Sequence, residues 1–172
     1  MLVNSEGTYT FEEFLKISEE IRCEYINEKI YMMAAPSPQH QAVVGNVFFS
    51  FKEYFQNGEC IPFVSPFEVV FEEKDGKQVV QPDVLIVCDR ENLKETYEGI
   101  PTLVVEVVSP SSSSRDYVVK LDLYTRKGVK EYWIIDPLEQ NAIRYNFKDA
   151  NIESYKVFDR DTEVDSIIFL DL

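Results

Sequence analysis

Histidine is nearly absent from this sequence, which contains His40 and no other. The sequence also has no GxSxG, no HExxH and no glycine-rich phosphate loop. These absences exclude the serine-hydrolase elbow, the zinc-protease helix and the phosphate-binding loop of nucleotide hydrolases. A cysteine nucleophile needs a histidine partner, for which only His40 is available.

Cysteine is scarce as well, and Cys23, Cys60 and Cys88 lie far apart with none of them in a CxxC spacing. That distribution argues against both a disulfide framework and a structural zinc site. We therefore expect three free thiols that fill space in the core of a cytoplasmic protein.

Long apolar runs are missing too, since none approaches the roughly 20 residues that a membrane-spanning helix needs. The first residues, MLVNSEGTYTFEEF, lack a basic region followed by an apolar stretch, which predicts that there is no secretory signal. With 172 residues and a hydrophobic content of 45%, the chain is expected to form one domain over residues 1–172.

Positive charge is in short supply, because 17 lysines and arginines face 31 aspartates and glutamates, for a net charge of -14. A protein that grips DNA through its phosphates is expected to be basic, or to have a basic face. This chain therefore either binds no nucleic acid or binds it locally, with metal ions offsetting carboxylates in a cleft.

The N-terminal part of the chain contains sequence patterns that predict two helices and a hairpin. Thr10 and Glu13 form a capping box that predicts a short helix. Apolar residues on both sides of a polar turn predict a β-hairpin over residues 21–33. Ser37 and Pro38 supply the N-cap and first position of a second helix.

The C-terminal part predicts a βαβ unit, made of an apolar strand, a helix from Arg115 to Lys127 and the strand EYWIIDP. Its two strands should be parallel neighbours in one sheet. The fold class is therefore α/β, with a mixed β-sheet flanked by helices. Further strands are predicted at residues 63–71, 79–88, 141–147, 153–159 and 166–170.

One carboxylate, Glu106, interrupts the apolar run LVVEVV, where an ionised group needs a compensating partner. Asp83 opens the apolar strand of QPDVLIVC, and Lys120 lies one helical turn after Asp116 on the same face. Two carboxylates from adjacent strands are the minimum that holds Mg²⁺. A nearby lysine can orient an attacking water and offset charge on a phosphoryl group, so these residues suit phosphodiester hydrolysis.

The arrangement of PD followed by ExV in an apolar strand resembles the PD-(D/E)xK nuclease core. More narrowly, three segments are similar to a bacterial family of restriction-endonuclease-like proteins and cover most of the chain from Cys23 to Pro137. The segments are YINEKIYMMAAPSPQHQAVVGNVF, QPDVLIVCD and PTLVVEVVSPSSSSRDYVVKLDLYTRKGVKEYWIIDP. The resemblance implies a restriction-endonuclease-like core and a DNA endonuclease dependent on Mg²⁺ or Mn²⁺.

The resemblance also implies roles for individual residues. It makes Asp83 and Glu106 metal ligands, with Glu24 as the best match for a third carboxylate. The nuclease pattern has its lysine two residues after the acid, where this chain has Val108. The family places that lysine on the following helix, at Lys120.

Two further residues are candidates for binding substrate. Ser109 follows the strand that carries Glu106, and it can hydrogen-bond a phosphate at the start of the next helix. His40 begins the second helix, inside one of the family-like segments. Alternatively, residues 111–114 form a serine loop that caps the helix.

Simpler structural roles remain open for the acidic residues. Asp83 can cap its own turn, as PD dipeptides often do, and Asp116 can favour the helix dipole. Glu106 can form a buried ion pair with Lys120 or Arg115.

Other functions are open in the same way. A catalytically silent binding or assembly module would fit the acidic composition, and 10 tyrosines and 12 phenylalanines could supply a homodimer face. A small-molecule hydrolase could use the same carboxylates, because a fold does not determine its substrate.

Overall fold

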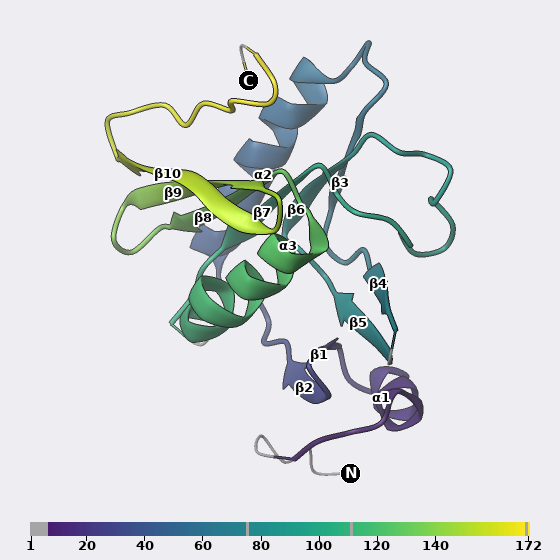
Figure 1. The fold of residues 1–172 in the computed structure, drawn as a ribbon. Coiled ribbons are helices and arrows are strands. Elements are labelled where there is room, and N and C mark those ends of the chain that lie inside the picture. The colour runs from purple at the N-terminus through teal and green to yellow at the C-terminus, as the bar shows by residue number, and fades with distance from the viewer. Residues whose placement is uncertain (1–6, 75, 111, 171) are drawn as a thin grey trace.

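The strands divide between two sheets (Figure 1) in a computed structural model that describes residues 7–74, 76–110, 112–170 and 172. The smaller sheet has four strands in the order β2-β1-β5-β4, and the larger has six in the order β10-β9-β8-β7-β6-β3. In chain order the elements are α1 (Phe11–Ser18), β1 (Cys23–Ile26), β2 (Lys29–Met32), α2 (Pro38–Tyr54), β3 (Ile61–Val64), β4 (Val69–Glu73), β5 (Gly76–Val80), β6 (Val84–Val87), β7 (Leu103–Val107), the π-helical segment η1 (Arg115–Lys120), α3 (Leu121–Lys127), β8 (Glu131–Asp136), β9 (Asn141–Lys148) and β10 (Asn151–Asp159).

The predicted βαβ unit forms the centre of the larger sheet. β7 pairs with β8 in parallel and with β6 antiparallel, and η1 and α3 make the crossover. α3 ends at Gly128, whose φ of 81° is left-handed and suits a residue without a Cβ. This parallel pairing confirms the arrangement expected from the sequence.

The helix caps and the hairpin also form as predicted. The Thr10–Glu13 capping box is present at α1, and the Ser37 side chain accepts a hydrogen bond at the start of α2. β1 and β2 pair antiparallel, and their turn places Asn27 and Glu28 at positive φ.

Prolines split two of the predicted strands. A cis bond between Ser65 and Pro66 separates β3 from β4, which belong to different sheets. Likewise, β5 ends before Pro82 in the smaller sheet and β6 begins after it in the larger. Proline cannot donate to a strand ladder, so the chain changes sheet there. Asp83 consequently lies at the junction of the two sheets.

Helices cover the two faces of the larger sheet. α3 packs on one face through Leu123 and Tyr124, and α2 packs on the other through Val44 and Phe51. α1 covers the smaller sheet with a separate apolar cluster that includes Phe14. No helix in the described ranges combines the length and apolar character that crossing a bilayer requires.

The predicted strand over residues 166–170 does not form, because this segment turns back across the larger sheet. The backbone N–H of Ile167 donates to the buried carboxylate of Glu131 at 3.1 Å, and the Phe169 ring packs against Phe55. Asp75 and Ser111, which belong to the predicted turn and serine loop, lie outside the described residues.

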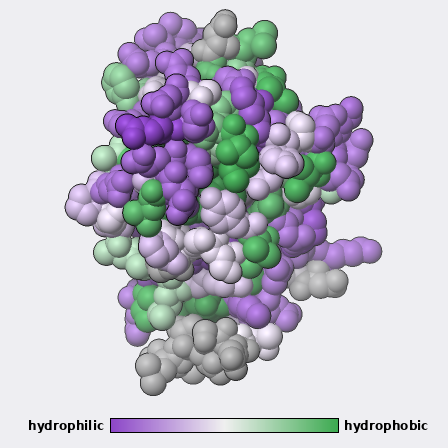
Figure 2. All heavy atoms as spheres, turned by 90° about the vertical axis from the view of Figure 1, so that its left-hand side faces the viewer, coloured by the Kyte–Doolittle hydropathy of each residue, from purple (hydrophilic) through white to green (hydrophobic). Residues whose placement is uncertain are grey.

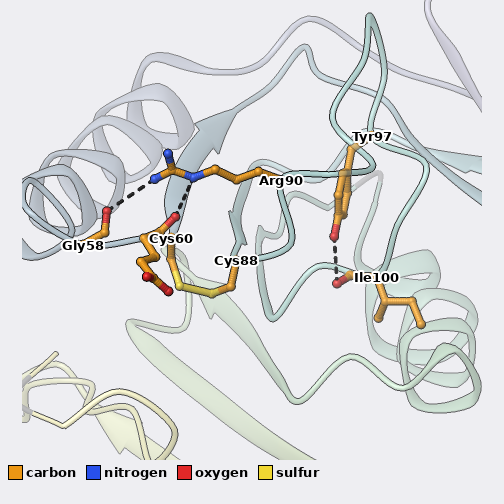
Figure 3. Close-up of a disulfide and its surroundings, with 7 residues drawn as sticks. Gly58, Cys60, Cys88, Arg90, Tyr97 and Ile100 are labelled. Atoms are coloured by element: carbon orange, nitrogen blue, oxygen red, sulfur yellow. Dashed lines mark hydrogen bonds between the residues drawn. A yellow bond between two sulfur atoms is a disulfide. The ribbon is translucent and has the colours of Figure 1, made fainter.

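The expectation of three free thiols is wrong, because Cys60 and Cys88 form a disulfide (Figure 3). The pair lies one step beyond the β3–β6 register, in which Ile61 faces Val87, so the two residues come together across the strands. Cys23 remains a buried thiol. The disulfide removes the argument for a reducing compartment that the cysteine spacing had suggested.

Candidate active site

A cavity of about 270 Å³ opens where the two sheets meet. It is bounded by the segment before α2, the start of β6, the end of β7 and η1. Five of the residues predicted from the sequence line it, namely Asp83, Glu106, Lys120, His40 and Ser109. Glu24 is fully buried in β1, within hydrogen-bonding reach of Lys120. The structure therefore brings all six together.

Asp83 is held at the edge of the cavity by two neighbours. Its Oδ2 accepts a hydrogen bond from the backbone N–H of Val107 at 2.8 Å. The Nε2 of His40 lies 3.2 Å from the same oxygen. Because both partners come from other elements, Asp83 is tied to β7 and α2 rather than to a turn of its own.

Glu106 projects from β7 and is 3% exposed. Its Oε1 accepts hydrogen bonds from Lys120 Nζ at 2.8 Å and from the Tyr124 hydroxyl at 2.9 Å. Burial raises the pKa of Glu106 well above its ordinary range, and the positive charge of Lys120 only partly opposes this. The nearby carboxylates of Asp116, Asp83 and Glu24 raise the pKa further.

Lys120 lies between two carboxylates in the interior. Its Nζ is 2.8 Å from Glu24 Oε1 as well as from Glu106 Oε1, and the residue is 1% exposed. Burial lowers the pKa of Lys120, but the surrounding carboxylates outweigh that effect and raise it overall. The ammonium group is therefore a permanent positive charge beside the cavity.

The π-helical turn adds two residues to this cluster that the sequence had not marked as catalytic. Arg115 Nε lies 3.4 Å from Glu24 Oε2 and 3.8 Å from Asp116 Oδ1. Asp116 is 2% exposed and its Oδ1 is 3.7 Å from Lys120 Nζ. From the sequence, Asp116 was interpreted as a first-turn acid that favours the helix dipole, because acidic residues are common at helix N-termini.

Negative charge exceeds positive charge in this buried group. Two cations, Lys120 and Arg115, share the three carboxylates of Glu24, Glu106 and Asp116, so the ionised group carries one surplus negative charge. Burial also raises the pKa of Asp116, as expected where carboxylates crowd together. The cluster therefore favours either a bound proton or an added cation.

The donor set suits a hard divalent cation more than zinc. Among the described residues, no group of three or more histidine, cysteine, aspartate or glutamate side chains is arranged to hold a metal ion. Asp83 and Glu106, however, both line the cavity, and Mg²⁺ is commonly held by one or two carboxylates with water completing its shell. Glu24 has its Oε1 bonded to Lys120 and to the backbone N–H of Gln81.

Ser109 and His40 border the cavity on different sides. Ser109 Oγ bonds Ser112 Oγ at 3.2 Å in the loop after β7. The backbone N–H of His40 donates to the capping Ser37 hydroxyl, and its side-chain Nε2 lies beside Asp83. The hydrogen bond to Asp83 raises the pKa of His40, although burial opposes it.

Three comparisons with known proteins agree with this architecture. The family model "Uma2: Putative restriction endonuclease" matches residues 11–171. An uncharacterized protein of Synechocystis sp. is 27% identical over 156 residues, which cover 87% of this chain and 81% of that protein. The crystal structure of "a putative nuclease belonging to DUF820" from Anabaena variabilis has a TM-score of 0.72 at 24% identity, covering 87% of this chain and 84% of that one. This likeness confirms the restriction-endonuclease-like fold expected from the sequence.

Proposed function

The chain belongs to the Uma2 family of restriction-endonuclease-like proteins, and on that basis we propose that it hydrolyses phosphodiester bonds of DNA with Mg²⁺ or Mn²⁺. The observation that carries the proposal is the buried cluster of surplus carboxylates around Lys120, open to a cavity through Asp83 and Glu106. In metal-dependent phosphodiester hydrolysis, a divalent cation and a fixed positive charge near the phosphoryl group both stabilise the charge that develops there.

We assign the metal to Asp83 and Glu106, which line the same cavity. When bound there, the ion supplies Lewis-acid stabilisation of the phosphoryl oxygens. His40 and the Val107 backbone N–H both contact Oδ2 of Asp83, so Oδ1 is the oxygen that would ligate the ion.

Because its pKa is raised, Lys120 stays protonated and serves as a hydrogen-bond donor instead of a base. From its position beside Glu106 it orients the attacking water and offsets charge on the phosphate. Glu24 keeps Lys120 in place, through the contact between Glu24 Oε1 and the ammonium group at 2.8 Å. We therefore give Glu24 a supporting role behind the cavity, in place of direct metal ligation.

The direct test is calorimetric titration of Mn²⁺ into the wild type and into Asp83→Asn and Glu106→Gln, with Asp122→Asn as a control. Asp122 is an exposed carboxylate on α3 that pairs with Arg126, so its loss changes the net charge equally without touching the cavity. We expect binding near stoichiometry in the wild type and control and at least a tenfold loss in the other two.

DNA cleavage with Mg²⁺, assayed on both single-stranded circular DNA and supercoiled plasmid, should follow the same order on whichever of the two is cut. Equal Mn²⁺ affinity in all four proteins would show that the carboxylates are purely structural. Cleavage at the wild-type rate in Glu106→Gln would refute the catalytic assignment even if the metal binds.

A second candidate is a silent assembly module that dimerises through β10. This strand ends the six-stranded sheet, and its Ile152, Tyr155 and Val157 are exposed. The face shown in Figure 2 carries small separate hydrophobic patches among hydrophilic residues. Sedimentation that shows a dimer, together with no response to Mn²⁺, would favour this candidate.

A further inference from the structure

Arg22 is one of the residues that line the cavity, and its guanidinium group is held by uncharged partners. Its Nε donates to Gln81 Oε1 at 2.7 Å, and a second guanidinium nitrogen bonds the Ser65 hydroxyl. Gln81 is itself held, because its side-chain nitrogen donates to Glu68 at 3.3 Å. Arg22 is exposed, and it forms no ion pair with any carboxylate in residues 7–74, 76–110, 112–170 or 172. It is therefore an oriented cation that lacks a counter-charge.

An apolar part of the cavity lining lies directly beside Arg22, because the backbone N–H of Met33 donates to the Arg22 carbonyl at 3.0 Å. The segment from Met32 to Pro36, reading MMAAP, forms this apolar wall, and Met32 is 56% exposed. Methionine, alanine and proline side chains offer no hydrogen bonds, but they can pack against the flat face of a nucleobase. A base can reach such a wall only if it is not stacked inside a duplex.

Elsewhere in the described part of the chain, the surface suits duplex phosphates poorly. Many surface cations are already paired, for example Lys77 with Glu72, Lys94 with Glu98 and Lys127 with Glu73. The net charge is -14, which repels the phosphates of a long duplex, whose binding depends on lysine and arginine contacts to several phosphates. A cavity of about 270 Å³ also lies near the lower limit for small-ligand sites, at roughly 300 Å³.

We propose that the cavity binds an unpaired nucleotide, whose base packs on Met32–Pro36 and whose neighbouring phosphate pairs with Arg22. The substrate would then be single-stranded nucleic acid, or an unpaired end or flap, instead of continuous duplex. This inference rests on the proposed function, because it places the phosphate that follows this nucleotide against Asp83 and Glu106. A flexible strand satisfies the site with one or two phosphates and turns away from the acidic surface.

Fluorescence anisotropy with a labelled single-stranded hexanucleotide of DNA tests the idea, alongside the same sequence inside a 20-base-pair blunt duplex. Ca²⁺ replaces Mg²⁺ so that the probes stay intact, and each titration is repeated in EDTA. We expect the hexanucleotide to bind at least tenfold more tightly than the duplex. Arg22→Gln should weaken its binding about tenfold and reduce the salt slope by about 0.7, as the loss of one phosphate contact predicts.

The matched control is Arg160→Gln, which removes the same charge from an exposed site beside Asp161. Met32→Asp tests the wall, and it should weaken hexanucleotide binding by a factor similar to that of Arg22→Gln. Equal losses in Arg22→Gln and Arg160→Gln, or tighter binding of the duplex, would overturn the proposal.

These measurements test the metal site and the nucleotide site independently of each other. If Mn²⁺ binds at Asp83 and Glu106 but neither probe binds, the metal site stands and the nucleotide site is refuted. If Mn²⁺ does not bind but Arg22→Gln still weakens hexanucleotide binding in EDTA, the nucleotide site stands and the metal-dependent function is refuted.

Discussion

Replacing Lys120 with methionine removes the cation between Glu24 and Glu106 while keeping an unbranched side chain in the core. Both carboxylates then lose a partner at 2.8 Å in a position that is 1% exposed. Removing one member of a buried ion pair costs about 3 to 5 kcal/mol. Glu24 keeps the Gln81 N–H and Glu106 keeps the Tyr124 hydroxyl, so we expect the lower end, about 3 kcal/mol.

The cost should depend on pH with a definite sign. Burial raises the pKa of Glu106 from its ordinary 4.5, and Lys120 lowers it, so the substitution raises it further. A carboxyl with a higher pKa in the folded than in the unfolded state favours folding below 4.5. That contribution disappears as the pH rises through the folded pKa. The deficit of Lys120→Met should therefore be smallest in acid and grow as the pH increases.

Urea unfolding followed by tryptophan fluorescence measures the free energy of unfolding of each variant. Trp133 is a suitable probe because it is the only tryptophan and is 4% exposed. The series covers the wild type, Lys120→Met, Lys120→Met with Glu106→Gln, and the exposed control Lys52→Met on α2. At neutral pH the free energy of unfolding of the double variant should exceed that of Lys120→Met by more than about 1 kcal/mol, because the double variant has lost an unpaired buried charge. A Lys120→Met protein as stable as the wild type, or a deficit that stays constant with pH, would refute the reasoning.

Two further predictions concern stability away from the cavity. Reducing the Cys60–Cys88 bond, which closes a separation of 28 residues, should lower the free energy of unfolding by about 3 kcal/mol, and Cys23→Ser should leave the response to reductant unchanged. Glu131→Ala removes the acceptor for Trp133 Nε1, Asn146 Nδ2 and the Ile167 N–H, at a cost of about 3 kcal/mol. Limited proteolysis of that variant should cut first within residues 160–172, and an uncut tail would contradict the role of Glu131.

Local patterns predicted the elements that have strong sequence signatures. The caps at Thr10 and Ser37 and the parallel βαβ unit needed only neighbouring residues and known handedness. The tertiary placement of strands was harder to predict, because Pro82 looks like an ordinary strand start in the sequence. Only the structure reveals that the chain passes from one sheet to the other at this proline.

The sequence predicted Glu106 as a site residue because a single carboxylate interrupts an apolar strand there. Arg22 was not found, because it is an ordinary surface residue unless one knows which strands meet. Arg115 was named only as a possible partner of Glu106, whereas in the structure it lies beside Glu24. The disulfide was missed for the same reason, since Cys60 and Cys88 become neighbours only through the β3–β6 register. Distances between remote segments depend on register, which composition and spacing do not encode.

The π-helical form of η1 makes the charged cluster sensitive to the length of the chain. Residues five apart on an α-helix point about 140° away from each other, so Arg115 and Lys120 would diverge there. In η1 both reach Glu24. If this segment became α-helical without losing a residue, the sheets and the core would remain, but Arg115 and Lys120 would no longer both reach Glu24. The charged cluster can thus be lost through the winding of one helical turn, with no change in the sheets that frame it.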